Sequence, residues 1–422
     1  MSSDLIKKSI ILLKSSCVFL YIVLLIGIDV HGQDLPQFIS TGVNNNSGLK
    51  AKYKAFEAAI SRVSQEGALP DPGLSFGYFV QPVETRIGPM QARISLSQMF
   101  PWFGTLKKKK SVSALLAESK YQEFLQARNV LIAEIKKSYY QIHELQAQIK
   151  LLQDELEIMD TYKSLVITSF STGKGTLSDI ILIDLQREEI KVSIEILEVQ
   201  LSLLTVQFNL LIEEKEDRQV IPEKLPDPSY DYQLLMPDLL AKNPQLNAIE
   251  QQILAMKERQ SLTVLNSLPR IGVGLDYTIV GEGSNPNFAD NGKDALMPMV
   301  TMTLPIFRSK YKSAVTEVSL KADELEYRKQ DYLNSLHADY QRERFELEKT
   351  QRRFRLFEQQ IRRINELIEL FYTAYSNSGK GFDDILKAQQ QILQYRMEKE
   401  TIIKQYYTAL AKLELITAKG LE

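Results

Sequence analysis

The fold is decided by short stretches that the chain carries twice. Residues 100–103 read Phe-Pro-Trp-Phe, and residues 304–307, 204 positions further on, read Leu-Pro-Ile-Phe. Gly-Lys-Gly at 173–175 recurs at 379–381, followed each time by an Asp-Ile pair, and Leu-Pro at 69–70 recurs at 268–269. Three landmarks in the same order at nearly constant spacing indicate a long internal repeat, which determines the architecture before any single residue does.

Composition excludes several classes of protein. The 422 residues include 51 basic and 53 acidic side chains, so nothing favours nucleic-acid binding, which usually needs a basic stripe. Cys17 is the single cysteine, which leaves no disulfide framework and no cysteine-based metal site. The length would ordinarily suggest two or three domains, but the repeat favours one unit built from two similar halves.

The first 32 residues are predicted to be a secretory signal peptide. Lys7 and Lys8 precede an uncharged apolar run at 17–28. As a helix this run would be about 18 Å long, which is too short to span a hydrocarbon core. The pattern is typical of a signal sequence, so we expect an exported chain.

Each half is predicted to contain a short helix, two strands, a very long helix and a return helix. Apolar residues alternate with small or polar ones at 74–78, 90–97, 271–279 and 300–304. Period-two alternation is the signal of a strand with two unlike faces. Strands of about ten residues have the length of tilted membrane-spanning β-strands.

Four strands raise the problem of open edges. They cannot close a barrel alone, and an open edge in lipid leaves backbone N–H and C=O groups without partners. If the strands span a membrane, the barrel must be shared between chains. The alternative is a soluble pair of β-hairpins packed on a helical body, and the alternation by itself does not decide between them.

The helices are more distinctive. From 105 to 172 the chain has neither glycine nor proline, and from 308 the next glycine is at 379, so each stretch predicts a helix of about 100 Å. Heptad spacing of apolar residues, as at Ile135, Ile142 and Ile149, predicts coiled coils. The glycine pairs then reverse the chain into return helices at about 177–212 and 382–418. The first repeat is therefore 33–212 and the second 237–422, joined by a proline-rich linker at 213–236.

This layout resembles the TolC family of outer-membrane efflux channels. The resemblance rests on the duplicated unit of two strands and a helical hairpin, the junction at 97–104, the two Gly-Lys-Gly reversals and Asn-Pro-Gln-Leu at 243–246. It covers essentially the whole mature chain. The junction and residues 69–72 look most like the outer-membrane partners of resistance-nodulation-division pumps for drugs or heavy metals.

The resemblance implies a fold that is mainly α with a small membrane β region. A homotrimer would form a twelve-stranded barrel in outer-membrane lipid and an α-helical tunnel in the periplasm. Such a channel conducts passively, while an inner-membrane pump and a periplasmic adaptor (membrane fusion protein) supply energy and connection. Residues with small or polar side chains would face the lumen: Arg93, Ser95, Ser97, Gly274, Asp276 and Thr278.

Four aromatic residues at the junctions are candidates for the membrane–water interface, where aromatic rings are favoured: Phe100, Trp102, Phe103 and Phe307. The alternative is that they plug the core where strand meets helix. The resemblance also implies that the reversals are the far tips of the tunnel, where the adaptor docks. The candidate contact residues are Gly173, Lys174, Gly175, Asp179, Gly379, Lys380 and Gly381.

Asp383 and Asp384 are candidates for an entrance gate, since a ring of carboxylates selects for cations. The alternative is plain helix capping, by Ser178 or Asp179 in the first hairpin and by Asp383 or Asp384 in the second. The first reversal also has one residue more between its glycines and the following aspartate than the second has.

An enzyme is poorly supported. His143 and His337 lie within long helices without histidine or cysteine partners at ligand spacing, and there is neither a phosphate loop nor a nucleophile motif. We expect no cofactor and no metal site. Two other functions are a periplasmic adaptor, which would carry one hairpin in a β-rich chain, and a coiled-coil scaffold of an export complex, which has no use for amphipathic strands.

Overall fold

The computed structural model describes residues 35–229, 242–284, 289–378 and 381–418. The expected signal peptide, residues 230–236 of the expected linker, and Gly379 and Lys380 lie outside them. The elements follow in the order α2 (Leu35–Asn45), α3 (Ser47–Glu66), β1 (Gly73–Thr85), β2 (Gly88–Phe100), α4 (Thr105–Ser171), α5 (Leu177–Leu211), α6 (Pro244–Leu265), β3 (Arg270–Val280), β4 (Ala295–Thr303), α7 (Arg308–Ser378) and α8 (Phe382–Thr417).

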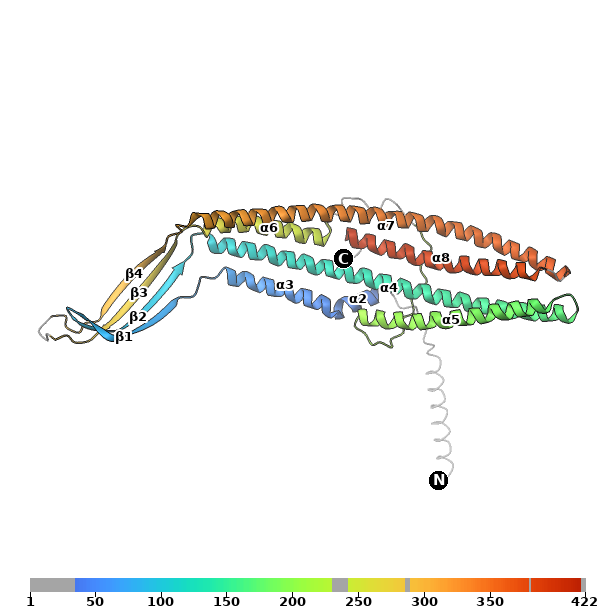
Figure 1. The fold of residues 1–422 in the computed structure, drawn as a ribbon, viewed down its shortest axis with the longest axis horizontal. Coiled ribbons are helices and arrows are strands. Elements are labelled where there is room, and N and C mark those ends of the chain that lie inside the picture. Colours follow the sequence, from blue (N-terminus) through green and yellow to red (C-terminus); the bar gives the residue numbers. More distant parts are fainter. Residues whose placement is uncertain (1–34, 230–241, 285–288, 379–380, 419–422) are drawn as a thin grey trace, which may run out of the picture.

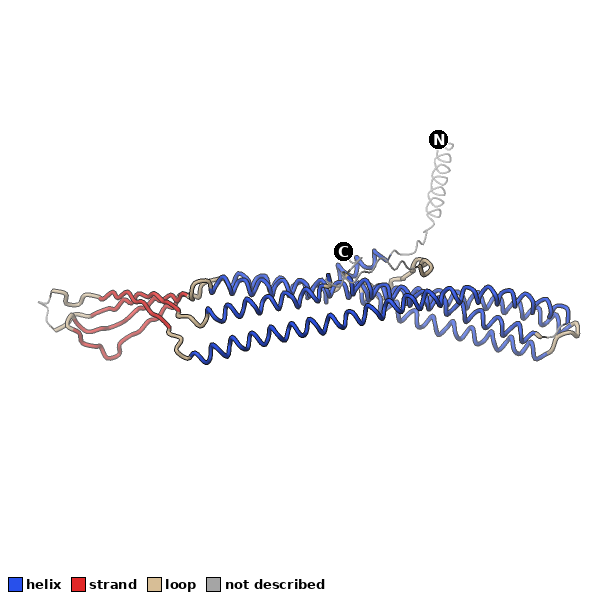
Figure 2. Tube along the Cα trace, turned by 90° about the horizontal axis from the view of Figure 1, so that it is seen from above, coloured by secondary structure: helices blue, strands red, loops and turns tan. Residues whose placement is uncertain are grey.

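The molecule is a long rod. A four-stranded sheet forms one end, and the α4–α5 and α7–α8 reversals lie together at the other (Figure 1). Seen at right angles, the helices again run lengthwise, from the strands at one end to the reversals at the other (Figure 2). Such a shape follows from helices that bury an apolar stripe only along their own length.

The two long helices have nearly matched lengths. Helix α4 has 67 residues and α7 has 71, so each is about 100 Å long at 1.5 Å per residue. Both begin directly after the duplicated aromatic junction, where Gly104 has a positive φ of 82°. The glycine-free and proline-free stretches thus predicted these helices to within a few residues at each end.

The sheet combines both repeats. Its strand order is β1-β2-β3-β4 with antiparallel neighbours throughout, and β2 of the first repeat pairs with β3 of the second from Phe100↔Ile271 to Met90↔Val280. Strands β1 and β2, with 13 residues each, are longer than the expected ten. The outer edges of the sheet are β1 and β4.

The helices form a wall one layer thick. Near the sheet, α4 packs between α3 and α6, and α7 packs on α6; farther away, α4 packs on α5 and α8, and α7 on α8. The central core gathers around the fully buried Phe38, Ile135, Ile142 and Phe208. Each repeat thus contributes a shorter helix near the sheet, α3 or α6, and a helical hairpin, α4–α5 or α7–α8, that extends to the far end of the rod.

One asparagine closes each repeat. The Asn46 side chain accepts a hydrogen bond from Leu49 N at the start of α3 and donates to the Leu211 carbonyl at the end of α5. Asn243 does the same between the start of α6 and the Ile416 carbonyl at the end of α8. Each amide satisfies an unpaired group at both helix termini. The Asn-x-x-Leu pattern at 46–49 and 243–246 is therefore a fourth landmark of the internal repeat. It was not recognised from the sequence alone.

Candidate membrane sheet and hairpin tips

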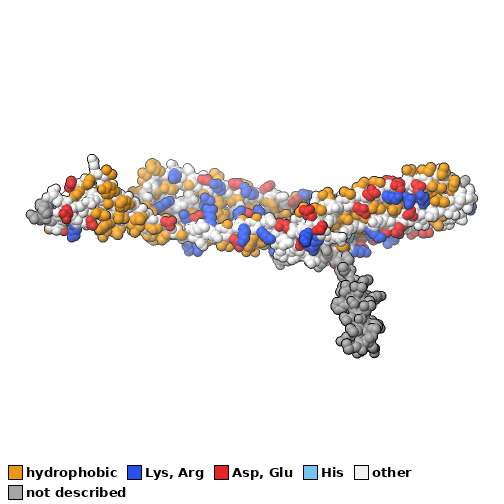
Figure 3. Space-filling view, turned by 90° about the horizontal axis from the view of Figure 1, so that it is seen from below, with side chains coloured by type: hydrophobic (Ala, Val, Ile, Leu, Met, Phe, Trp, Pro, Cys, Tyr) orange, Lys and Arg blue, Asp and Glu red, His pale blue; other side chains and the backbone are white. Residues whose placement is uncertain are grey.

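The sheet has one continuous apolar face. Cross-strand register aligns Phe76, Ile94, Tyr277 and Leu296 in one row across all four strands. Their exposed fractions are 70%, 38%, 40% and 63%. The next row, Leu74, Leu96, Leu275 and Pro298, has the same character. The space-filling view shows apolar side chains gathered over this end of the rod (Figure 3). An exposed apolar face this large marks a surface that meets lipid or another chain.

The opposite face of the sheet is polar. It carries Ser95 beside Asp276 and Arg93 beside Thr278 on neighbouring strands. Asp276 is nearly buried, and its Oδ2 lies 3.7 Å from Nε of Arg93. Neither Arg93 Nε nor Asp276 Oδ1 has a hydrogen-bond partner within the described residues. The alternation read from the sequence therefore places the expected lumen residues on one face, opposite the apolar rows.

The aromatic residues lie where this sheet meets the helices. Phe103 and Phe307 are 83% and 76% exposed, Phe100 is partly exposed, and Trp102 is half-buried beside the Phe103 ring. Phe103 and Phe307 are thus on the surface of the described chain, whereas Trp102 is packed at the junction. Together with Pro101, Pro269 and Ile271, the rings of the first junction enclose a small apolar cavity of about 290 Å³.

The first hairpin tip is closed by backbone and side-chain hydrogen bonds. Gly173 has a positive φ of 78°, and the N–H groups of Lys174 and Gly175 both donate to the Ser169 carbonyl. Thr176 then forms a reciprocal capping box with Asp179 at the start of α5. The expected cap at Ser178 or Asp179 is therefore wrong in position: Thr176 is the cap, and Asp179 completes the box. Capping boxes of this kind define helix N-termini.

The second tip differs, and Gly379 and Lys380 lie outside the described part of it. Gly381, with a positive φ of 87°, occupies the cap position of α8 without a side-chain hydrogen bond, so the expected cap at Asp383 or Asp384 is also wrong. Asp383 instead pairs with Lys387 one turn on, at 3.0 Å, and this hydrogen bond holds the pKa of Asp383 below its ordinary value. Asp384 is exposed. The first reversal is one residue longer because Thr176 stands between its glycines and α5 as the cap. In the second reversal Gly381 is itself the cap.

The hairpins pack on each other behind these tips. Val166 of α4, Ile183 of α5, and Tyr375, Phe382 and Ile385 of the second hairpin belong to one buried apolar cluster. Phe382 contacts the rings of both Tyr375 and Tyr162. Because the cluster takes side chains from all four distal helices, moving one hairpin away from the other would expose it.

Helix α5 presents an apolar stripe that no described part of the chain covers. Six residues at heptad spacing are 51–73% exposed: Leu185, Val192, Ile196, Val199, Leu203 and Leu210. By length and composition α5 could also cross a membrane. Its opposite face, with Ile183, Ile190 and Phe208, is buried within the hairpin. An a/d stripe of this kind is the surface by which helices form coiled coils.

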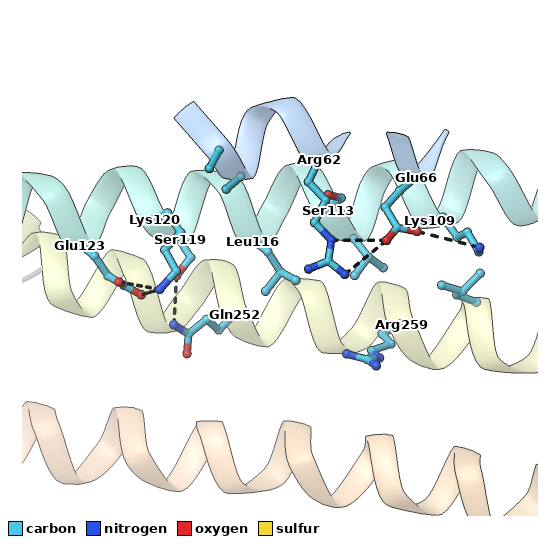
Figure 4. A pocket seen from close by; sticks show the side chains of 14 residues that line it. Arg62, Glu66, Lys109, Ser113, Leu116, Ser119, Lys120, Glu123, Gln252 and Arg259 are labelled. Atoms are coloured by element: carbon cyan, nitrogen blue, oxygen red, sulfur yellow. Dashed lines mark hydrogen bonds and ion pairs between the residues drawn. The ribbon is translucent and has the colours of Figure 1, made fainter. Parts of the chain in front are cut away.

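A charged groove of about 650 Å³ lies between α3 and α6, with α4 as its floor. Figure 4 shows Glu66 between Arg62 and Lys109, at 3.4 and 3.9 Å, and Gln252 donating to Ser119 on the neighbouring helix. These contacts join α3, α4 and α6, so the groove is a seam of the wall. Across the described residues no group of three or more histidine, cysteine or acidic side chains could hold a metal.

His143 has a structural role in this fold. Its Nε2 accepts a hydrogen bond from the Leu225 N–H at 3.4 Å, which ties the linker to α4, and burial lowers its pKa. The imidazole thus has a backbone partner within the fold, and it belongs to no cluster of metal-ligand side chains among the described residues.

Several solved structures have this architecture over nearly the whole chain. The outer-membrane channel OprN superposes with a TM-score of 0.76 at 16% identity, over 92% of this chain and 90% of its own. The outer membrane protein VceC from Vibrio cholerae gives 0.76 at 14% identity, over 92% and 97%. CusC, whose structures concern transmembrane channel formation, gives 0.78 at 11% identity, over 92% and 95%. This chain has the outer-membrane channel fold. No family model and no curated protein sequence matches it.

In the channel fold, a sheet with two unlike faces and a rod of helical hairpins occur together as parts of one architecture. It confirms, at the level of fold, the resemblance read from the duplicated landmarks. Identities of 11–16% mean that the shape is preserved with few identical side chains. The roles of individual residues therefore have to be derived from this chain's own geometry.

Proposed function

We propose that this chain is the outer-membrane channel of a tripartite efflux system. It conducts drugs, metal ions or other small molecules passively from a pump and adaptor across the outer membrane. One observation carries the proposal: the described sheet has an apolar face, a polar face and two outer edges, β1 and β4, without a neighbouring strand. Such a sheet is stable in lipid only when its edges are paired.

A homotrimer satisfies both edges. Because the strands alternate in direction and their number is even, β4 of one chain lies antiparallel to β1 of the next. Three chains then close a twelve-stranded barrel with an interior wide enough for passage, since eight strands are only just filled by side chains. The exposed heptad stripe of α5 gives the same assembly a helical interface in the periplasm.

In this barrel the polar face lines the lumen and the apolar rows contact lipid. Arg93 and Asp276 pair there across neighbouring strands, so three such pairs surround the passage. Paired charges of opposite sign leave the wall polar without a strong preference for either sign of ion. This fits a channel that accepts varied substrates from a pump.

The periplasmic tips contact the adaptor and close the tunnel. Gly173, Lys174, Asp179 and Gly381 are at least partly exposed at the two reversals, where a partner can reach them. Asp383 is paired with Lys387, so Asp384 is the better of the two candidates for a ring of carboxylates. Opening separates the hairpins at the cluster around Phe382.

The proposed function includes the expected division of the chain into a signal peptide, two repeats and a linker. Residues 1–32 direct export and are removed. Residues 33–212 and 237–422 are the two repeats, and 213–236 are the equatorial linker between them. The helical body stands in the periplasm while the sheet alone is in the membrane.

Two measurements on the same detergent-purified sample test the proposal. Light scattering should give three times the chain mass, and planar-bilayer recording should give conductance that persists without any energy source. A monomer in mild detergent, or a trimer that never conducts, would contradict it.

Pull-down with a periplasmic adaptor, compared between the wild type and Lys174→Glu, tests the tip contact separately.

A further inference from the structure

Both long helices begin with a group of basic residues directly beneath the sheet. Residues 107–110 of α4 are all lysine, and α7 begins with Arg308, Lys310 and Lys312, with no acidic residue in either first turn. Positive charge is unfavourable at a helix N-terminus, because the helix dipole is positive there. The same unfavourable placement in both repeats calls for an anion outside the helices.

The protein itself neutralises only part of this charge. Lys108 pairs with Glu258 at 2.7 Å and Lys109 lies 3.9 Å from Glu66, both across helix–helix contacts. Within the described residues no ion pair joins an acidic side chain to the remaining five: Lys107, Lys110, Arg308, Lys310 and Lys312. All five are exposed.

An apolar cavity lies at the same junction between sheet and helices. It holds about 290 Å³ and is lined by Phe100, Pro101, Trp102, Phe103, Pro269 and Ile271. Lys107 lies four residues after Phe103, in the first turn of α4. Arg308 Nη1 donates to the Ser267 carbonyl at 3.4 Å, two residues before Pro269. The volume is near the lower end of what small-ligand sites enclose, which suits a short segment of an acyl chain.

The type of side chain changes in a fixed order along the rod. Phe100 and Ile271 pair across strands and belong to the apolar face of the sheet, each 38% exposed. The aromatic cavity follows, and then the cations. This is the order met along a phospholipid from acyl chain to glycerol to phosphate.

We propose that the region where the sheet meets the helices binds an anionic phospholipid of the periplasmic leaflet, one for each chain. An acyl chain enters the cavity around Trp102, and the phosphate contacts Lys107 and Arg308. The inference rests on the proposed membrane position of the sheet, and goes beyond it by assigning a lipid class. Basic side chains near a membrane surface each gain from anionic headgroups, so the site prefers phosphatidylglycerol to phosphatidylcholine.

Trp102 provides a direct measurement, because it is the single tryptophan of the chain. The full chain is reconstituted in phosphatidylcholine vesicles that contain a small fraction of chain-brominated phosphatidylglycerol. Bromine quenches a tryptophan that it contacts. The same fraction of brominated phosphatidylcholine serves as the reference. We expect stronger quenching by the brominated phosphatidylglycerol, with a ratio that falls towards one at high salt.

Charge variants identify the site. Lys107→Gln and Arg308→Gln should each lower the lipid preference by up to about fivefold, the factor that corresponds to about 1 kcal/mol per cation. Lys107→Arg and Arg308→Lys should preserve it. Lys52→Gln, on the exposed surface of α3 away from the junction, removes the same charge and should leave the ratio unchanged.

Equal quenching by both brominated lipids, or a preference that survives the double variant Lys107→Gln, Arg308→Gln, would overturn the proposal. Conductance and mass are measured on the same samples. A conducting trimer without lipid preference refutes the lipid site alone. A lipid preference without conductance or trimer refutes the channel and keeps the lipid site, and the absence of all three refutes both.

Discussion

The Gln389 side-chain amide on α8 donates a hydrogen bond of 2.9 Å to the Glu155 carboxylate on α4. Glu155 is 3% exposed and lies along the contact that joins the two hairpins. Arg396 and Tyr162 are the other polar groups that act on it electrostatically. A buried carboxylate with one neutral partner is costly to ionise, so this contact is sensitive to pH.

Glu155→Gln should stabilise the protein near neutral pH. Burial raises the pKa of Glu155 above its usual 4.5, and the Gln389 hydrogen bond and the Arg396 charge offset only part of this effect. A raised pKa in the folded state means that stability is full below pH 4.5 and is lost as pH rises through the folded-state pKa. The melting temperature of the variant should therefore exceed that of the wild type by a few degrees at pH 7 and match it near pH 4.

The exposed Glu157, two residues along the same helix, provides the control for this measurement. Glu157→Gln should leave the pH profile of the melting temperature unchanged. A Glu155→Gln variant that is less stable than wild type at pH 7 would show that the ionised carboxylate is favoured in the folded state, contrary to the burial argument.

Asn243→Ala should cost more stability than Asn46→Ala. Both remove a helix cap and a hydrogen bond to the end of the return helix, but Asn243 is 1% exposed, and it also accepts from Tyr332. Loss of a cap costs about 1 kcal/mol, and leaving buried groups unpaired costs about 1–3 kcal/mol more. Urea unfolding followed by helical circular dichroism measures both, and equal losses would contradict the role assigned to burial.

Gly88→Ala should prevent proper closure of the β1–β2 hairpin. Gly88 has a φ of 127°, and a Cβ there would lie 1.9 Å from the Gly281 carbonyl oxygen in the neighbouring loop. Strain of this kind costs about 1–3 kcal/mol before the steric clash is counted. Gly77→Ala on β1 is the matched control, since no atom lies within 4 Å of a Cβ at that position. The yield of membrane-inserted trimer should fall for Gly88→Ala only.

Val199→Asp should weaken the trimer and leave the hairpin folded. Val199 is 73% exposed in the stripe of α5, on the side away from the α4 contact. If the stripe is buried between chains, each copy loses about 1.5–3 kcal/mol of apolar burial. Light scattering should then show dissociation at concentrations where the wild type stays trimeric, with unchanged helical circular dichroism. The exposed Ser202 lies about 60° beyond Val199, outside the stripe, and Ser202→Asp should remain trimeric; dissociation of both variants equally would reject the stripe as an interface.

Much of the fold could be predicted because its signals are local. Helices α4 and α7 end at glycines that any chain would use to stop a helix, and the two faces of β2 and β3 follow from alternation alone. The caps of the return helices could not be predicted correctly. Aspartate is as good a cap as threonine, and only the path of the turn decides that Thr176 and Gly381 occupy those positions.

By itself, the sequence determined the repeat, the lengths of the helices and the unlike faces of the strands, since each depends on residues close together in the chain. Only the tertiary structure decided that β2 pairs with β3, that Asn46 and Asn243 join the ends of each repeat, and that Glu155 meets Gln389. All of these contacts, the strand pairing included, join residues 165 to 234 positions apart, and no local pattern encodes such a distance. They form because most buried polar groups in folded proteins are hydrogen-bonded, and here the partners come from distant parts of the chain.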